Sequence, residues 1–171
     1  MKRIHIIGPA GSGKSYLAKK LNIHTNIPAY ELDNIFWNNQ SDKYDTLQVP
    51  EIRNQMLEKY CTTEKWIIEG VFYKWCDVSF EKADVIIFIK APLFLCRLRV
   101  IRRFLFRKLS PKRKCRDTVA STIKLLKWMK EYNNEDIPAI NIQLKKYEKK
   151  LIVIRKADKV LKHIKEIQNI A

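Results

Sequence analysis

The stretch Gly8-Pro9-Ala10-Gly11-Ser12-Gly13-Lys14-Ser15 matches the whole G-x-x-x-x-G-K-[ST] pattern of a phosphate-binding loop. The apolar run from Ile4 to Ile7 precedes it and suits a buried parallel strand. The segment from Tyr16 to Asn22 follows without Gly or Pro and carries apolar residues at helical spacing. A strand, this loop and then a helix form the context in which the motif binds phosphate.

Each residue type in this loop has a physical role. Glycines let backbone N–H groups close around phosphate oxygens without a Cβ in the way, and the following helix adds partial positive charge. We expect Lys14 to reach the β- and γ-phosphates of a nucleotide and the Ser15 hydroxyl to bind a metal ion. The predicted cofactors are therefore ATP, bound by residues 8–15, and Mg²⁺. The alternative is a Gly-rich turn that binds nothing.

Length and composition predict one soluble domain. A chain of 171 residues is long enough for a sheet covered on both faces. The longest purely apolar run, Val85 to Ile89, is too short to span a bilayer, and Met1-Lys2-Arg3 leads straight into the first strand. We therefore expect no signal peptide and no membrane partner. Four scattered cysteines without a C-x-x-C pair predict reduced thiols in the cytoplasm. They are Cys61, Cys76, Cys96 and Cys115.

Alternating strand and helix patterns predict a three-layer α/β/α sandwich around a mostly parallel sheet. Ligands of such sheets bind at the carboxyl ends of the strands. We expect Asp117 to cap the N-terminus of its helix. The expected strands are 4–7, 28–33, 66–70, 84–90 and 151–154, and the expected helices are 16–22, 51–60, 92–108, 117–132, 140–151 and 160–167.

Two acids are expected at these carboxyl ends. Glu69 follows the strand Trp66 to Ile68, where phosphate-loop proteins keep the acid that orients Mg²⁺ or its water. Asp33 is predicted to end the second strand and to face a substrate hydroxyl or the metal shell. The alternatives are an ordinary strand-end acid for Glu69 and a turn or capping aspartate for Asp33. Phe36 and Trp37 either stack on a ligand ring or form a hydrophobic plug.

Arginines gather in one segment of this strongly basic chain. The net charge of +16 implies an anionic partner. The segment 97–116 holds no acid, and Arg99, Arg103 and Arg107 fall at i, i+4 and i+8 of a helix. Like charges at this spacing repel each other by roughly 0.2–0.5 kcal/mol per pair, and a bound anion relieves that repulsion. Arginines suit phosphate oxygens and neutralise a transferring phosphoryl group. The alternatives are a solubilising face and a nucleic-acid-binding stripe. The segment contains Arg97, Arg99, Arg102, Arg103, Arg107, Arg113 and Arg116.

Several segments resemble, in the same order, the bacterial DNA topology modulation proteins. That group belongs to the adenylate kinase-like and shikimate kinase-like class of small phosphate-loop kinases. The resemblance covers nearly the whole chain. It implies a single domain over 1–171 with five parallel strands, a mobile lid at about 104–117 and an acceptor-binding side from 33 to about 60. The segments are 8–15, Glu31-Leu32-Asp33-Asn34-Ile35-Phe36-Trp37, Trp66-Ile67-Ile68-Glu69-Gly70, Arg99-Val100-Ile101-Arg102-Arg103 and 126–133.

These observations together predict a Mg²⁺- and ATP-dependent kinase. Its acceptor is an unidentified small molecule, with a nucleotide or nucleoside favoured, and a monomer is the favoured state. Ser15 and Glu69 are the expected metal residues. The alternatives are a nucleic-acid-binding ATPase or regulator related to DNA topology, and an ATP-binding protein that has lost turnover. The expected catalytic residues are Lys14, Asp33, Arg99, Arg103 and the lid arginines Arg113 and Arg116.

One further arginine has two interpretations. Arg53 is the only arginine between Arg3 and Arg97. It either holds a phosphate group of the acceptor or is a charge on a helix surface.

Overall fold

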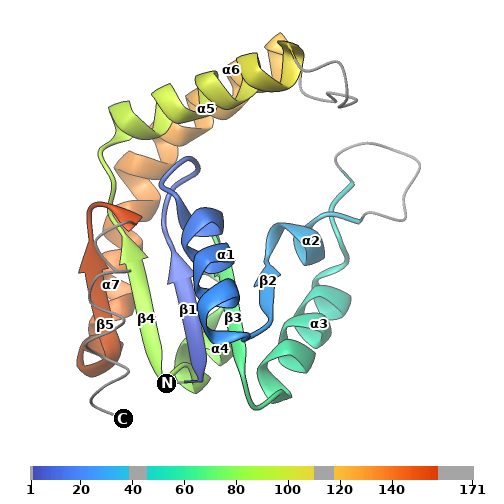
Figure 1. Cartoon of the computed structure of the whole chain (residues 1–171), viewed down its shortest axis with the longest axis vertical. Coiled ribbons are helices and arrows are strands. Elements are labelled where there is room, and N and C mark those ends of the chain that lie inside the picture. The colour runs from blue at the N-terminus through green and yellow to red at the C-terminus, as the bar shows by residue number, and fades with distance from the viewer. Residues whose placement is uncertain (1, 39–45, 110–117, 158–171) are drawn as a thin grey trace.

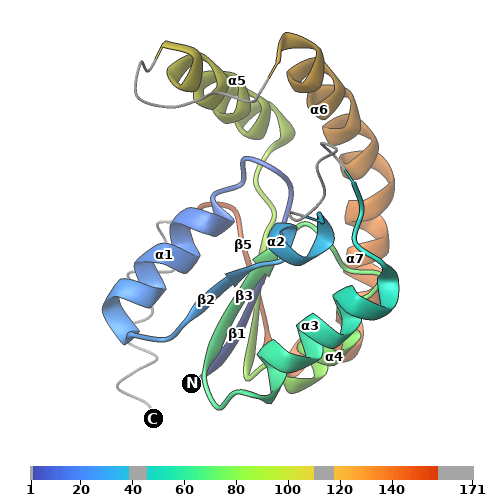
Figure 2. The same ribbon diagram turned by 90° about the vertical axis from the view of Figure 1, so that its right-hand side faces the viewer.

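Parallel strands form one sheet in the order β2-β3-β1-β4-β5 (Figure 1). The computed structural model of the chain describes residues 2–38, 46–109 and 118–157. Helices cover both faces of the sheet, which confirms the predicted three-layer α/β/α fold (Figure 2). The strands are β1 (Arg3–Ile7), β2 (Ala29–Glu31), β3 (Trp66–Gly70), β4 (Val85–Ile89) and β5 (Leu151–Ile154).

The helices separate into two groups by the face of the sheet that they cover. α1 packs on one face together with the first turns of α5 and the last turn of α6. α3, α4 and α7 pack on the other face. The helical elements are α1 (Lys14–Thr25), α2 (Asp33–Phe36), α3 (Pro50–Thr62), α4 (Asp77–Lys82), α5 (Leu93–Leu109), α6 (Val119–Glu131), the π-helix η1 (Tyr132–Asp136), α7 (Ile137–Leu144) and the 3₁₀-helix η2 (Lys145–Lys150).

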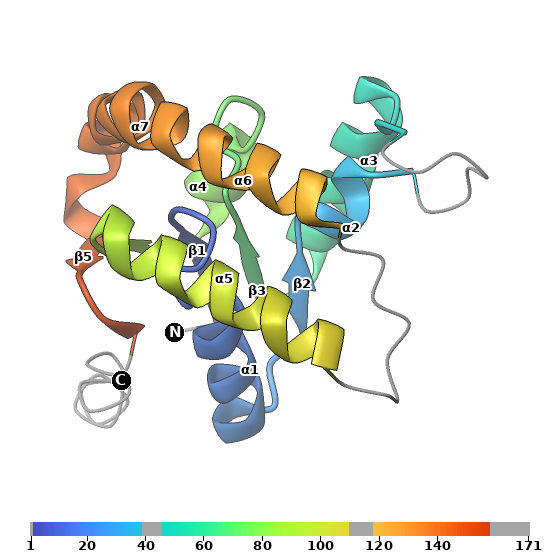
Figure 3. The same cartoon turned by 90° about the horizontal axis from the view of Figure 1, so that it is seen from above.

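The central position of β1 places the phosphate loop in the middle of the sheet. Ile7, the last residue of β1, pairs with Gly70 of β3 on one side and Phe88 of β4 on the other. The loop therefore leaves the sheet beside the end of β3, where Glu69 lies. α5 and α6 extend beyond these carboxyl ends (Figure 1) and lie side by side (Figure 3).

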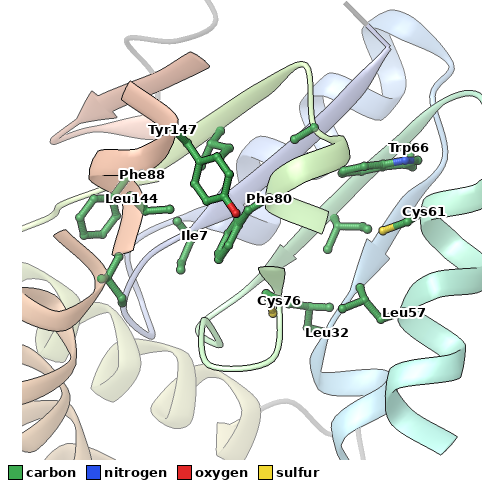
Figure 4. Close-up of a cluster of buried hydrophobic side chains, with 14 of the residues drawn as sticks. Ile7, Leu32, Leu57, Cys61, Trp66, Cys76, Phe80, Phe88, Leu144 and Tyr147 are labelled. Carbon is green, nitrogen blue, oxygen red and sulfur yellow. The ribbon is translucent and has the colours of Figure 1, made fainter. Parts of the chain in front are cut away.

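The larger of the two hydrophobic cores lies under α3, α4 and α7 (Figure 4). Trp66, Phe80 and Phe88 are its largest fully buried side chains besides Tyr132. Burying a side chain of this size stabilises a fold by roughly 1.5–3 kcal/mol. Cys61 and Cys76 lie in this core and Cys96 in the other, all as free thiols. Among the described residues, no helix is long and apolar enough to cross a membrane.

The structure corrects the predicted position of Asp33. β2 ends at Glu31, and Asp33 is the first residue of α2 rather than the end of a strand. The Leu32 N–H still donates to the Glu69 carbonyl at 2.8 Å, but the Leu32 carbonyl already accepts from the N–H of Phe36 at 3.0 Å. The chain therefore turns into a helix one residue after its last bond to β3.

Other helix boundaries also differ from the expectation. The cap of α6 is Thr118, whose side chain accepts from the Ser121 N–H, while Asp117 lies outside the described residues. α1 is longer than expected and ends where Asn26 adopts a left-handed conformation, with φ 54°. α4 was not expected, because six residues are too few to reveal helical periodicity. The predicted helix at 160–167 lies outside the described residues.

His5 on β1 is a buried polar side chain in the core. Ser79 Oγ donates to the Cys76 carbonyl at 2.8 Å and lies 3.0 Å from His5 Nδ1, so it accepts a hydrogen bond from that nitrogen. His5 Nε2 has no hydrogen-bond partner among the described residues. Burial lowers the pKa of His5 from 6.5 to about 3. The fold therefore holds this imidazole in its neutral form.

Acid should destabilise the protein through His5. Between pH 6.5 and about 3 the unfolded chain protonates this imidazole and the fold does not. The free energy of unfolding should therefore fall by about 1.4 kcal/mol for each pH unit of acidification in that window. Urea denaturation of the wild type and of His5→Gln measures this, with the exposed His24→Gln as control. Equal pH slopes for the wild type and His5→Gln would contradict the prediction.

Candidate active site

The phosphate loop is packed directly against the first turns of α5. Gly11 and Gly13 have φ angles of 75° and 103°, which side-chain-bearing residues rarely adopt. A Cβ on Gly11 would lie 2.5 Å from the backbone oxygen of Cys96. The loop and α5 therefore meet backbone to backbone, which leaves no room for a side chain at position 11.

Lys14 lies buried within this loop. Its Nζ donates to the Pro9 carbonyl at 3.0 Å. Burial lowers the pKa of Lys14, while the nearby carboxyl groups of Glu69 and Asp33 raise it and Arg103 lowers it further. Both predicted acids therefore act on the charge of this ammonium group.

Ser15 and Glu69 form the second contact of the site. Ser15 Oγ donates to Glu69 Oε1 at 2.5 Å, which joins the start of α1 to the end of β3. Glu69 is buried, and burial raises the pKa of its carboxyl group, whereas Lys14 and the Ser15 hydrogen bond lower it. A hydroxyl and a carboxylate in contact provide two oxygen ligands of the kind that Mg²⁺ prefers.

Asp33 approaches the same site from α2. Asp33 is exposed, yet partial loss of solvent raises the pKa of its carboxyl group, while Lys14 and Arg103 lower it. The fold thus gathers Lys14, Asp33, Glu69 and Arg103 near the carboxyl ends of the strands. Asp33 belongs to this group although it starts α2 and does not end a strand as predicted.

The arginines of α5 have different environments. Arg99 Nη1 donates to the carbonyls of Gly11 and Ser12 at 3.2 and 3.1 Å, so it binds the loop itself. Arg97 Nη2 donates to the Leu126 carbonyl at 2.9 Å and joins α5 to α6. Arg113 and Arg116 lie outside the described residues, as does most of the lid expected at 104–117. The residues at 104–109 belong to α5.

An aromatic row extends from α2 to α3 on the side where the acceptor was expected. The ring of Phe36 lies 4.3 Å from Phe72, and Phe72 lies 5.3 Å from Trp75. The guanidinium of Arg53 lies 4.4 Å from the centre of the Trp75 ring. Arg53 is therefore held against an aromatic face and is only half exposed. Phe36 also contacts Trp37, edge to face.

Sequence reasoning missed the contacts that hold the segment after β3. The Tyr132 hydroxyl donates to the Val71 carbonyl at 2.8 Å, and the Tyr73 hydroxyl donates to Asp136 Oδ1 at 2.8 Å. Gln143 Nε2 donates to the Tyr73 carbonyl at 3.3 Å. These bonds come from η1 and α7 and position the segment that carries Phe72. A buried tyrosine has no sequence signal that distinguishes it from other core aromatics.

No protein-family profile matches the chain. An uncharacterized protein of Bacillus subtilis (strain 168), YqaC, is 34% identical over 92 residues, which are 53% of this chain and 50% of that protein. The chain thus matches about half the length of this curated relative.

Solved structures are similar over almost the whole chain. A shikimate kinase from Bacteroides thetaiotaomicron aligns over 92% of this chain and 87% of its own, at 17% identity and a TM-score of 0.52. An uncharacterized protein from Eubacterium ventriosum ATCC 27560 aligns over 98% of both chains, at 18% identity and a TM-score of 0.55. The chain therefore shares the three-layer α/β/α fold of a shikimate kinase. The narrower resemblance to DNA topology modulation proteins stays a prediction.

Alanine at position 11 should loosen the contact between the loop and α5. Both Gly11→Ala and Gly13→Ala place a Cβ on a left-handed backbone, which costs roughly 1–2 kcal/mol. Gly11→Ala should destabilise the protein more, because its Cβ meets the Cys96 oxygen at 2.5 Å, whereas a Cβ on Gly13 meets Ala157 at 3.3 Å. Chemical denaturation of both variants measures the difference. Equal losses of unfolding free energy would show that the backbone contact is unimportant.

Proposed function

We propose that this protein transfers the γ-phosphoryl group of ATP to a small-molecule acceptor, with a nucleotide or nucleoside favoured. The main support is the gathering of a complete phosphate loop, two carboxyl groups and two arginines of α5 at one edge of the sheet. The similarity in fold to a shikimate kinase supports the same class of reaction. The proposed setting is the cytoplasm, where ATP is available, and the proposed state is a monomer.

The residues of the loop fit a nucleotide with its metal ion. Gly11 leaves the loop free of a side chain where it lies closest to α5, and the buried Ser12 Oγ has no hydrogen-bond partner among the described residues. Lys14 would hold the β- and γ-phosphates, and Ser15 with Glu69 would hold Mg²⁺. When bound, the ion offsets the negative charge of the phosphates.

Asp33 would act on the acceptor. In the transfer, the acceptor oxygen forms a bond to the γ-phosphorus, the bond from that phosphorus to the bridging oxygen of ADP breaks, and the acceptor hydroxyl loses its proton. Asp33 would orient that hydroxyl and take the proton. Its raised pKa suits this role, because it makes the carboxylate a stronger base than a fully solvated aspartate.

The arginines would stabilise the transferring group. The positive charge of Arg103 lowers the pKa of both Lys14 and Asp33, which supports a role for this arginine near the proposed reaction centre. Arg99 would position the loop through its two carbonyl contacts and add positive charge. One arginine of the proposed lid, Arg113 or Arg116, would complete the set. Phosphoryl transfer relies on this kind of neutralisation more than on covalent chemistry.

The aromatic row supports a planar, anionic acceptor. Phe36 stands one helical turn from Asp33, and Phe72 and Trp75 extend the row away from it. A nucleobase or similar ring would stack there, and Arg53 would bind an acceptor phosphate. This arrangement is the reason for favouring a nucleotide or nucleoside over other small hydroxy compounds.

Labelled phosphate should pass from ATP to at least one compound in a panel of nucleosides, nucleoside monophosphates and small hydroxy acids. Lys14→Ala should abolish this transfer and greatly weaken Mg²⁺–ATP binding in calorimetry, because it removes the charge at the β- and γ-phosphates. Lys19→Ala, on the exposed side of α1, is the matched control. Equal ATP affinity in the wild type and Lys14→Ala would contradict the site, and ATP binding without transfer would favour a protein that has lost turnover.

Arg103→Ala should lower kcat and kcat/KM together by about 10³-fold while changing ATP affinity little, because the arginine acts in the transition state. Arg102→Ala, one residue away on an exposed position, is the control. A salt titration of DNA binding on the same variants tests the rival function. Unchanged turnover in Arg103→Ala, with a log–log salt slope shallower by about one, would favour the nucleic-acid-binding protein.

A further inference from the structure

The outward side of α5 carries an apolar stripe that belongs to neither hydrophobic core. Its members recur every three or four residues and therefore share one side of the helix. All are exposed, from 39% for Ile101 to 80% for Leu109. We call them the α5 stripe: Phe94, Leu98, Ile101, Leu105 and Leu109.

The α5 stripe points away from the candidate active site. On the opposite side of the helix, the backbone of Cys96 packs against Gly11 and Arg99 binds the loop carbonyls. A third side contacts α6, where Arg97 donates to the Leu126 carbonyl. The α5 stripe is therefore left over after the contacts to the loop and to α6 have been made.

Positive charge surrounds the α5 stripe. α5 holds six basic residues and no acid, and its neighbour α6 holds three lysines and a single acid, Glu131, at its far end. By helical spacing, Arg102 lies along one edge of the stripe and Lys108 along the other. α5 is thus an amphipathic helix whose apolar face is bordered by cations on both edges.

The chemistry of the α5 stripe distinguishes between three occupants. The outside of a nucleic-acid duplex offers phosphates but little apolar surface for a row of four aliphatic side chains and one aromatic side chain. A second copy of this chain would bring two acid-free basic helices together, which like-charge repulsion opposes. An anionic bilayer offers phosphates at its surface and an apolar layer just beneath them, and basic amphipathic helices bind at that boundary.

We propose that α5 docks on the surface of an anionic lipid bilayer. The α5 stripe would enter the boundary between headgroups and acyl chains, and Arg102 and Lys108 would bind lipid phosphates. A helix of 17 residues is about 25 Å long, so the contact would lie in the plane of the membrane. This revises the expectation of no membrane partner, which rested on the lack of a membrane-spanning run.

Vesicle co-sedimentation tests the proposal without any assay of turnover. The full chain is mixed with vesicles of phosphatidylcholine alone or of phosphatidylcholine with phosphatidylglycerol. The stripe variant Leu98→Gln/Leu105→Gln is compared with Ile142→Gln, which alters a 70% exposed apolar residue on α7. All three proteins are first checked for equal thermal unfolding. We expect binding to the phosphatidylglycerol vesicles only, reduced roughly ten-fold or more in the stripe variant and unchanged in Ile142→Gln.

Four results of the vesicle experiment would overturn the proposal. They are no binding of the wild type to the anionic vesicles, equal binding to neutral ones, binding that the stripe variant retains in full, and a loss of binding in Ile142→Gln that matches the stripe variant. Sedimentation velocity without vesicles tests whether a second copy of the chain binds the α5 stripe instead. Self-association that Leu98→Gln/Leu105→Gln abolishes would assign the α5 stripe to a second copy and would also overturn the membrane proposal.

Discussion

The backbone contact between Gly11 and Cys96 is the constraint on which the rest of the site depends. Because the backbone of the phosphate loop and the backbone of α5 meet without a side chain between them, the direction of α5 is fixed relative to the loop. That direction brings Arg99 onto the loop carbonyls and Arg103 near Asp33. It also determines which side of α5 is left facing outward. One glycine thus sets both the charge around the loop and the exposed apolar surface.

The sequence predicted most of the fold, because its strands are continuous apolar runs and its loop has a full motif. The errors occur where tertiary contacts override local pattern. Asp33 was expected in a strand, but the Leu32 carbonyl turns the chain into α2. α4 is too short for periodicity to reveal, and Thr118 replaces Asp117 as the cap of α6 because it forms a reciprocal pair with Ser121.

The candidate site was predictable to the extent that its residues follow strands. Lys14 and Ser15 come from the motif, and Glu69 from the apolar strand before it, and the structure places all three in contact or nearly so. The stacking of Arg53 on Trp75 joins residues from two elements, so no local pattern could reveal it. The bond from Tyr132 to Val71 depends on a π-helix, which has no periodic signature of its own.

The side chains before and after that π-helix pack on opposite faces of the sheet. Met129, before it, belongs to the core beside α1, whereas Ile140 and Leu144, after it, belong to the core under α3. A π-turn holds one residue more than an α-turn, which advances everything downstream by about 100° around the helix axis. η1 therefore acts as a one-residue insertion that rotates the side chains of α7 around the helix axis relative to those of α6. Removing a residue from it would rotate the hydrophobic side of α7 off the sheet, although every apolar residue of the helix would still be present.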